Sequence, residues 1–324
     1  EQVLAYLAQP LTIREQEMVV SASIGIVASA GYTEPEALLR DADAAMYQAK
    51  LRGKAQWVLF DAQMRAQVAG PLQLEWDLRR VIERQELVLY YQPIVVLATG
   101  RVVGWEALVR WHHPQRGLIS PAEFIPLAEE SGFILPLGQW VLATATAQLR
   151  TWQQRGWCEE QVYVSVNLSG RQVAHSCLVE WVETALTKSG LPPRCLCLEV
   201  TESAIREGME RVLRNLTTLS ELGVGLSIDD FGTGYSSLSR LHQLPMDTLK
   251  IDRSFVQSLG QPGSATNLVQ GIVTLAASLG MEVVAEGIET SAQLWELKDM
   301  GVTYGQGFLF AKPGPDSVMP LNWD

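Results

Sequence analysis

The chain has 324 residues, 47% of them hydrophobic and 19% charged, which suits one large globular domain with an appendage or two domains. Its net charge of −11 disfavours nonspecific binding to DNA or RNA polymers, because the phosphate backbone dominates that affinity. No apolar run reaches the ~18 residues that a membrane helix needs, and no segment has the pattern of a signal peptide. We therefore expect a cytoplasmic chain without membrane contacts of its own, which a longer parent protein could still anchor to a membrane.

The cysteines indicate the same compartment. They contain no CxxC pair, and we expect them to be buried small apolar residues in a reducing environment. They are Cys158, Cys177, Cys195 and Cys197.

The first 61 residues predict a small α+β unit. Residues 19–29 (VVSASIGIVAS) and 57–61 (WVLFD) have strand character, and residues 34–53 between them predict an amphipathic helix that ends at Gly53. One face of this helix collects Leu38, Leu39, Ala42, Ala45, Met46 and Ala49. Residues 62–84 are rich in Arg, Gln and Leu and predict a helical connector in two pieces, because Gly70 and Pro71 interrupt it.

From residue 85 to the end, strand patterns alternate with helix patterns, which favours parallel pairing with crossover helices. The predicted strands are 87–97, 102–111, 162–169, 195–203, 224–232, 248–255, 282–289 and 304–310. The predicted helices are 137–156, 178–190, 208–223, 267–280 and 290–301, and the last four end in glycine, the usual left-handed cap. About eight strands in about 240 residues predict a TIM-like (β/α)₈ barrel. An open doubly wound sheet is the alternative, weakened because no Gly-rich phosphate loop follows the first strand.

Most of these strands end in a specific polar side chain. In a barrel the carboxyl ends of the strands meet at one mouth, so these side chains should lie together. A solvated strand end explains any one of them, but not the whole series. Several carboxylates this close would repel one another unless cations neutralise them. The residues are Glu106, Asn167, Glu199, Asp229, Asp230, Lys250, Glu286 and Gln306.

The candidate ligands are all oxygen donors, and none of the four histidines ends a strand of the series. Oxygen ligands suit hard ions such as Mg²⁺ or Mn²⁺. Asp229 and Asp230 are adjacent, so they serve one site only if the strand bends, and Gly232 and Gly234 supply the freedom to bend. Two metal ions roughly 3.5–4 Å apart recur in phosphoester hydrolysis.

These motifs resemble the EAL domain, a phosphodiesterase of the bacterial second messenger cyclic di-GMP. Glu106-Ala107-Leu108 is the name-giving tripeptide, and YYQPI, VNLS, LEVTES, DDFGTGYSSL, LKIDRSFV, VAEGIE and QGFLFAKP follow the family pattern in order. The resemblance covers residues 85 to about 315. It implies a (β/α)₈-like barrel with one antiparallel strand, in agreement with a hairpin around Gly100. It also implies metal-dependent hydrolysis of cyclic di-GMP to linear pGpG.

The resemblance also implies a role for each residue. Glu106, Asn167, Glu199 and Asp229 match the ligands of one metal ion, and Asp229 and Asp230 match those of the second, whose surroundings include Gln306. Lys250 matches a lysine beside the attacking water, and Glu286 and Glu106 complete the catalytic set.

Other family positions concern the substrate and a loop. Arg110 and Gln92 match substrate-binding positions; elsewhere an exposed arginine would be a plain surface residue. Glu202 matches a glutamate that anchors the loop after Asp230, and its other interpretation is a first-turn acid of the next helix.

Residues 1–61 resemble the C-terminal part of a GGDEF diguanylate cyclase domain, through SASIGIV, DADAAMYQAK and WVLFD. Lys50 matches a lysine that meets GTP phosphate, and Lys54 stands where an arginine is usual. The Gly-Gly-Asp-Glu-Phe turn is absent from these residues, so we expect no cyclase activity. The domains expected are 1–61, the connector 62–84 and the barrel 85–324.

Two further function classes are open: a non-catalytic cyclic di-GMP receptor and a partner-binding module. We also expect a homodimer through the barrel, formed by a predicted helix that contains Leu238, Leu241 and Leu244 and by the helix at 267–280. The alternative is that these leucines face the barrel's own core. Upstream sensor domains of the parent chain would act on that association through the connector.

Overall fold

The computed structural model describes most of the chain. The described residues are 2–7, 11–13, 16–18, 20–29, 34–61, 73–206, 209–232, 242–260 and 265–315. They belong to two compact units, Glu1–Arg80 and Val81–Asp324. The division falls inside the predicted connector, and the exact domain limits stay predictions. The Gly70–Pro71 break lies outside the described residues.

The first unit consists of short strands and one long helix. Helix α1 (Gln2–Leu7) precedes the antiparallel pair β1 (Leu11–Ile13) and β2 (Gln16–Met18). Strands β3 (Ile24–Ile26) and β4 (Trp57–Leu59) pair in parallel and are joined through α2 (Pro35–Leu51). The predicted strand–helix–strand order is therefore confirmed.

The buried face of α2 differs in part from the prediction. Ala45 and Ala49 are buried against Val58 of β4, as expected of an amphipathic helix on a sheet. Leu39 was predicted on the same face but is 63% exposed, and Asp41 is fully buried. The helical period was right, but the face that meets the sheet is rotated from the one that hydrophobicity alone selects.

The second unit is a closed barrel. Its strands are β5 (Leu87–Val96), β6 (Val102–His113), β8 (Tyr163–Leu168), β9 (Leu196–Thr201), β10 (Gly225–Phe231), β11 (Thr248–Ile251), β12 (Glu282–Ala285) and β13 (Tyr304–Gly305). From β6 through β8 to β13 each neighbouring pair is parallel, and β5 closes the ring by pairing antiparallel with both β6 and β13. The TIM-like barrel with one antiparallel strand is confirmed.

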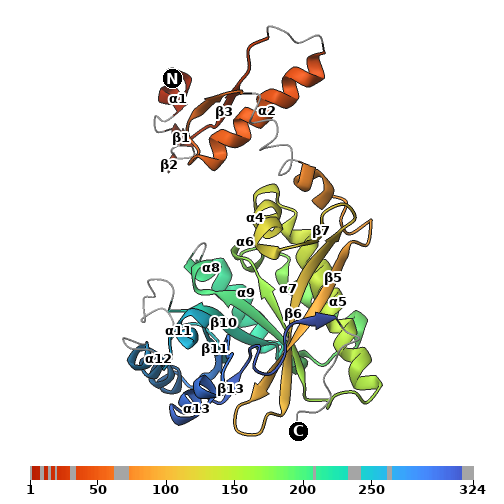
Figure 1. Ribbon diagram of the computed structural model, residues 1–324, viewed down its shortest axis with the longest axis vertical. Helices are drawn as coiled ribbons and strands as arrows, with labels where there is room; N and C mark the ends of the chain where they lie inside the picture. The colour runs from red at the N-terminus through yellow and green to blue at the C-terminus, as the bar shows by residue number, and fades with distance from the viewer. Residues whose placement is uncertain are drawn as a thin grey trace. The chain divides into compact units, whose positions relative to one another are not determined.

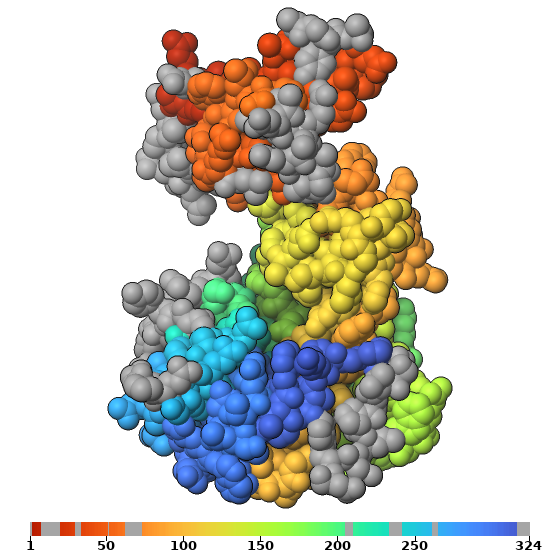
Figure 2. Space-filling model, viewed as in Figure 1, coloured from red at the N-terminus to blue at the C-terminus, as the bar shows by residue number. Residues whose placement is uncertain are grey.

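The two ends of this unit's sequence lie side by side (Figures 1 and 2). Strand β5 (orange) lies between β6 on one side and, on the other, β13 and the short β14 (Gly314–Pro315), both blue. The β5–β6 hairpin turns at Gly100, whose φ of 73° is in the left-handed region, and β7 (Gly117–Ile119) extends the ribbon beyond the barrel.

Helices connect and cover the strands. They are α4 (Pro121–Ser131), α5 (Ile134–Gln154), α6 (Gly170–Val173), α7 (Leu178–Ser189), α8 (Glu202–Arg206), α9 (Met209–Glu221), α11 (Arg253–Gln257), α12 (Thr266–Ser278) and α13 (Ser291–Asp299), with a 3₁₀ turn at Pro193–Cys195. Helix α4 was not predicted. The glycines after α7, α9, α12 and α13 have φ between 69° and 85°, which confirms the predicted left-handed caps.

The faces expected to form a dimer are described only in part. Leu238 and Leu241 lie outside the described residues, and Leu244 is buried. On α12, Val269 and Ile272 are buried within the chain, whereas Leu268 is 48% exposed. Homodimer formation therefore stays a prediction.

Two simpler expectations are also tested. No helix among the described residues has both the length and the hydropathy of a membrane span. All four cysteines are free thiols, but only Cys195 is buried; Cys158, Cys177 and Cys197 are partly exposed, so the expectation of burial was wrong for three of them.

Candidate metal and phosphodiester site

Lys250 of β11 is the centre of the acidic cluster. Its side chain is 1% exposed, and its Nζ lies 2.6 Å from Glu199 Oε2 and 2.5 Å from Glu286 Oε1. Asp229 Oδ1 and Glu106 Oε2 lie 3.5 and 3.8 Å away. Four carboxylates from β6, β9, β10 and the end of β12 thus converge on one ammonium, as the strand-end pattern predicted.

Two amide side chains tie this cluster together. Asn167 Nδ2 donates to Glu106 Oε1 at 2.8 Å. Gln306 Nε2 donates to Glu106 Oε2 at 2.6 Å and to Glu286 Oε1 at 3.3 Å. The other amide atom of Gln306, Oε1, is buried and has no hydrogen-bond partner among the described residues. That oxygen is an acceptor on a side chain that contacts Glu106 and Glu286, and a cation bound there could satisfy it.

The strand carrying the paired aspartates bends at Asp230. Its φ is +53°, and the β10–β11 register shifts between Ile228 and Phe231. Aspartate tolerates this left-handed conformation better than most residues. The bend was expected from the glycines; Gly232 has a φ of +97°, Gly234 lies outside the described residues, and the first strained residue is Asp230 itself.

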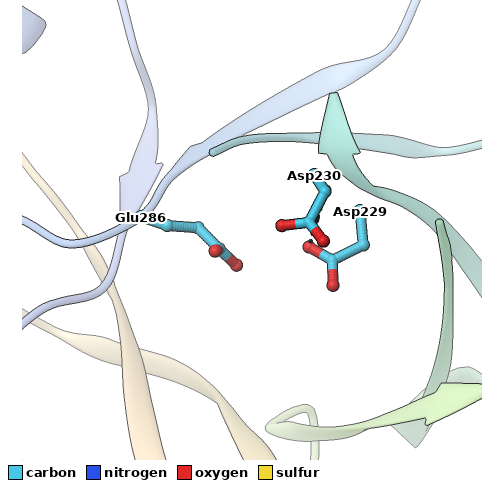
Figure 3. A group of neighbouring side chains, drawn as sticks. All are labelled: Asp229, Asp230 and Glu286. Atoms are coloured by element: carbon cyan, nitrogen blue, oxygen red, sulfur yellow. Dashed lines mark hydrogen bonds between the residues drawn. The ribbon is translucent and has the colours of Figure 1, made fainter. Parts of the chain in front are cut away.

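The bend puts both aspartates into one site. Asp229, Asp230 and Glu286 offer carboxylate oxygens within 4.8 Å of one another (Figure 3). In the figure the two aspartates leave neighbouring points of β10, and Glu286 faces them from the opposite side. The backbone N–H of Asp230 donates to Asp229 Oδ1 at 3.0 Å, which fixes that carboxylate.

Burial and mutual repulsion make several carboxyl groups weak acids. Burial raises the pKa of Glu199 to about 8, although Lys250 opposes it. Burial, then the charge of Asp229, raises the pKa of Asp230 to about 6, and burial raises that of Glu286. Burial alone would lower the pKa of Lys250, but the surrounding carboxylates outweigh it and hold the pKa well above its usual value.

The donor set fits divalent cations. One ammonium lies within 3.8 Å of Glu106, Glu199, Asp229 and Glu286, and Asp230 adds a fifth carboxyl group beside Asp229, so acidic groups outnumber the one positive charge. A hard cation that prefers oxygen ligands would supply the missing positive charge. The unpartnered Oε1 of Gln306 could also bind to it.

A cavity of about 540 Å³ adjoins the cluster. Residues of β6, α4, α5 and α6 line it, among them Arg110 of β6. Asn167 of β8 also lines the cavity and donates a hydrogen bond to Glu106, so the cavity and the cluster are neighbours. Arg110 is partly buried: its Nη1 donates to the carbonyl of Val109 at 2.9 Å, and its guanidinium lies 5.5 Å from the centre of the Tyr90 ring. Burial lowers the pKa of Arg110, so it is not a plain surface arginine.

Two other predicted residues lie near the site with different environments. Gln92 is the cross-strand partner of Glu106, but its Nε2 donates to the carbonyl of Ala311 at 3.0 Å. Glu202 begins α8 and is therefore a first-turn acid, yet it is buried and neither carboxylate oxygen has a partner among the described residues. The loop that it is predicted to anchor, residues 233–241, lies outside the described residues.

The sequence analysis missed Asp252. Its carboxylate accepts from the backbone N–H of Ser254, caps α11, and also hydrogen-bonds to Asp230. It stands two residues after Lys250, in LKIDRSF, so its position just past a strand end was a usable signal. Glu129 and Arg171, which line the cavity, carried no such signal because they lie on α4 and α6.

The fold and the site together define a (β/α)₈-type barrel with an acidic, oxygen-rich centre at its mouth. Residues 75–313 match the family described as "EAL domain", and residues 1–56 match "Diguanylate cyclase, GGDEF domain". The chain belongs to the EAL domain family.

Two curated relatives carry names that describe their activity. The chain is 45% identical over 317 residues to the bifunctional diguanylate cyclase/cyclic di-GMP phosphodiesterase MucR of Pseudomonas aeruginosa, which covers 97% of this chain and 46% of that protein. It is 39% identical over 314 residues to the cyclic di-GMP phosphodiesterase PdeR of Escherichia coli, covering 97% and 47%. The chain thus spans about half the length of these relatives.

Solved structures give the same fold. The PaMucR phosphodiesterase in complex with c-di-GMP is 47% identical, covers 75% of this chain and 98% of its own, and has a TM-score of 0.72. The EAL enzyme Bd1971 bound to cAMP and cyclic di-GMP is 34% identical, covers 84% and 74%, and has a TM-score of 0.74.

Proposed function

We propose that this chain hydrolyses cyclic di-GMP to linear pGpG with the help of two divalent cations, Mg²⁺ or Mn²⁺. One observation carries the proposal: four carboxylates from separate strands converge on one buried lysine, two amide side chains bond to these carboxylates, and a cavity lined in part by Arg110 adjoins them. The names of the relatives agree with this chemistry.

Each predicted ligand has a place in this proposal. Glu106, Asn167, Glu199 and Asp229 would hold one ion. Asp229 and Asp230 would hold the second, near Gln306. When bound, such ions lower the pKa of water and stabilise a leaving oxygen.

Lys250 would position the attacking water rather than deprotonate it. In the metal-free site the surrounding carboxylates outweigh burial and hold its pKa well above the usual value, so the ammonium is charged there and can donate hydrogen bonds. The bound ions would themselves lower the pKa of the water, so no proton transfer to Lys250 is required. Glu286 lies 2.5 Å from Lys250 Nζ and would orient the ammonium toward the water. The oxygen of water adds to one phosphorus, the bond from that phosphorus to the ribose 3′ oxygen breaks, and a proton goes to that oxygen.

The substrate would extend from this centre into the adjacent cavity. Arg110 would bind a phosphate, because its guanidinium lies on the cavity wall next to the carboxylate cluster. Gln92 lies beside Glu106 and would contact the same end of the substrate. Glu202 would anchor the loop after Asp230 and so act only through that loop.

The test is a direct assay of the purified chain. Cyclic di-GMP is incubated with Mg²⁺, with Mn²⁺ or with excess chelator, and pGpG is separated chromatographically. We expect product only with a divalent ion, and none from Glu199→Gln. Binding of cyclic di-GMP without turnover in every condition would instead identify a receptor. A parallel incubation with GTP should yield no cyclic di-GMP, since the GGDEF-like region lacks the signature turn.

A further inference from the structure

Two serines with unpartnered hydroxyls line the barrel interior below the carboxylate cluster. Ser165 of β8 is 0% exposed and Ser227 of β10 is 1% exposed. Neither hydroxyl has a hydrogen-bond partner in the described part of the chain. Buried polar groups in folded proteins are almost always paired, and leaving one unpaired is costly. Two such groups in one interior layer therefore need an explanation.

The strand register places each serine beside a carboxylate of the site. Ser165 lies two residues before Asn167, and Ser227 two before Asp229, so each shares the inward face of its strand with a site residue. In the parallel pairings, Ser165 is the partner of Glu106 and Ser227 is the partner of Glu199. Neighbouring strands are about 4.8 Å apart, a span that one water molecule can bridge between a short hydroxyl and a longer side chain.

Packing alone does not account for these residues. The interior of a barrel of this type is usually filled with branched apolar side chains. Lys250, two residues beyond the register partner of Ser227, Thr248, is also fully buried in the interior, and its long side chain calls for small neighbours. Alanine is also small and would leave no buried hydroxyl without a partner. The need for a small side chain therefore does not explain why serine stands at these positions.

We propose that Ser165 and Ser227 are positioning residues of the metal site, whose hydroxyls hydrogen-bond through ordered water to Glu106 and Glu199. The inference rests on the proposed function, since it takes both glutamates as metal ligands. Enclosed waters typically join groups that would otherwise be unsatisfied. Partners behind the ligands of a metal orient those ligands and set its affinity. The two serines would thus hold the carboxylates ready for the ion.

The experiment measures Mn²⁺ binding to the whole chain by titration calorimetry, together with the unfolding temperature of the metal-free protein. Ser165→Ala and Ser227→Ala should each weaken Mn²⁺ binding about 10-fold. The matched control is Ser189→Ala, whose hydroxyl donates to the carbonyl of Ala185 in α7 at 2.8 Å and lies outside the site. That variant should bind Mn²⁺ as the wild type does.

The unfolding temperature of the metal-free protein shows whether the serine hydroxyls stabilise the fold or cost stability, which the Mn²⁺ affinity does not show. If the hydroxyls are simply unpaired, removing them relieves a cost, so the variants would unfold at a higher temperature with unchanged Mn²⁺ affinity. Unchanged affinity overturns the proposal whichever way the unfolding temperature moves. If wild-type protein binds no Mn²⁺, the proposed metal-dependent function fails and this inference with it.

A second measurement covers variants that do not fold. In a high-resolution crystal structure of the wild-type protein with Mn²⁺, a water should lie within hydrogen-bond distance of each serine Oγ and of its partner carboxylate. Dry, apolar surroundings at both hydroxyls would overturn the proposal.

Discussion

Replacing Lys250 with methionine tests the centre of the site. Methionine has a similar length and remains apolar, so the change removes the ammonium and little volume. The ammonium is fully buried, touches Glu199 and Glu286 within 2.6 Å, and has two further carboxylates within 3.8 Å. Its loss leaves these carboxylates without their shared counter-charge.

The expected cost is large. Removing one partner of a buried ion pair costs about 3–5 kcal/mol, because the remaining charge is uncompensated. In a domain of this size each kcal/mol corresponds to about 2–4 °C, so the unfolding temperature should fall by about 6–20 °C in chelator. The fall should be smaller with Mg²⁺, which restores positive charge, and smaller near pH 6, where Glu199 with its pKa of about 8 is already mostly protonated.

The assays are calorimetric unfolding with and without Mg²⁺ and a pGpG release assay. Turnover should fall about 100-fold or more, while cyclic di-GMP affinity stays within several-fold. Lys188→Met, at an exposed lysine of α7, is the matched control and should change neither quantity. Wild-type thermal stability of Lys250→Met in chelator would refute the electrostatic reasoning. Loss of cyclic di-GMP binding with unchanged turnover would instead show that Lys250 binds a phosphate of the substrate.

Further predictions concern the ions, the shared ligand, pH and association. Mg²⁺ or Mn²⁺ should be required for hydrolysis, whereas Ca²⁺ should support binding with little turnover because its looser shell places water poorly; full activity in chelator would contradict this. Asp229→Asn should lower the rate more than 10-fold, since the ligand would be shared by both ions, and a smaller loss would show that the ligand is not shared. Folding raises the pKa of Glu199 from 4.5 to about 8, so the folded state binds the proton more tightly and the metal-free protein should lose stability as pH rises through that window. The rise in unfolding temperature on adding Mg²⁺ should therefore be larger at pH 8 than at pH 6, and an equal rise would count against a metal at Glu199. A dimer at micromolar concentration, measured by light scattering, should weaken with Leu241→Glu; a strictly monomeric active protein would end that hypothesis.

Much of the architecture was readable in the sequence because it depends on local patterns. Alternating strand and helix periodicity predicted the barrel, and the terminal glycines predicted the helix caps at Gly190 and Gly280. The polar residues at most of the strand ends predicted the cluster, since parallel strands bring their carboxyl ends to one mouth. The prediction failed at α4, which carries Pro126 inside the helix, and it chose the wrong face of α2, as with Leu39.

Tertiary structure alone decided which side chains touch. The sequence placed Lys250, Glu199 and Glu286 at one mouth, but only the register of the neighbouring strands β9 to β12 brought them within 2.6 Å. The left-handed turn at Asp230, the hydrogen bond from Asp252, and the unpartnered hydroxyls of Ser165 and Ser227 are likewise invisible in the sequence. They depend on distances between strands that lie far apart along the chain, and local patterns carry no information about such distances.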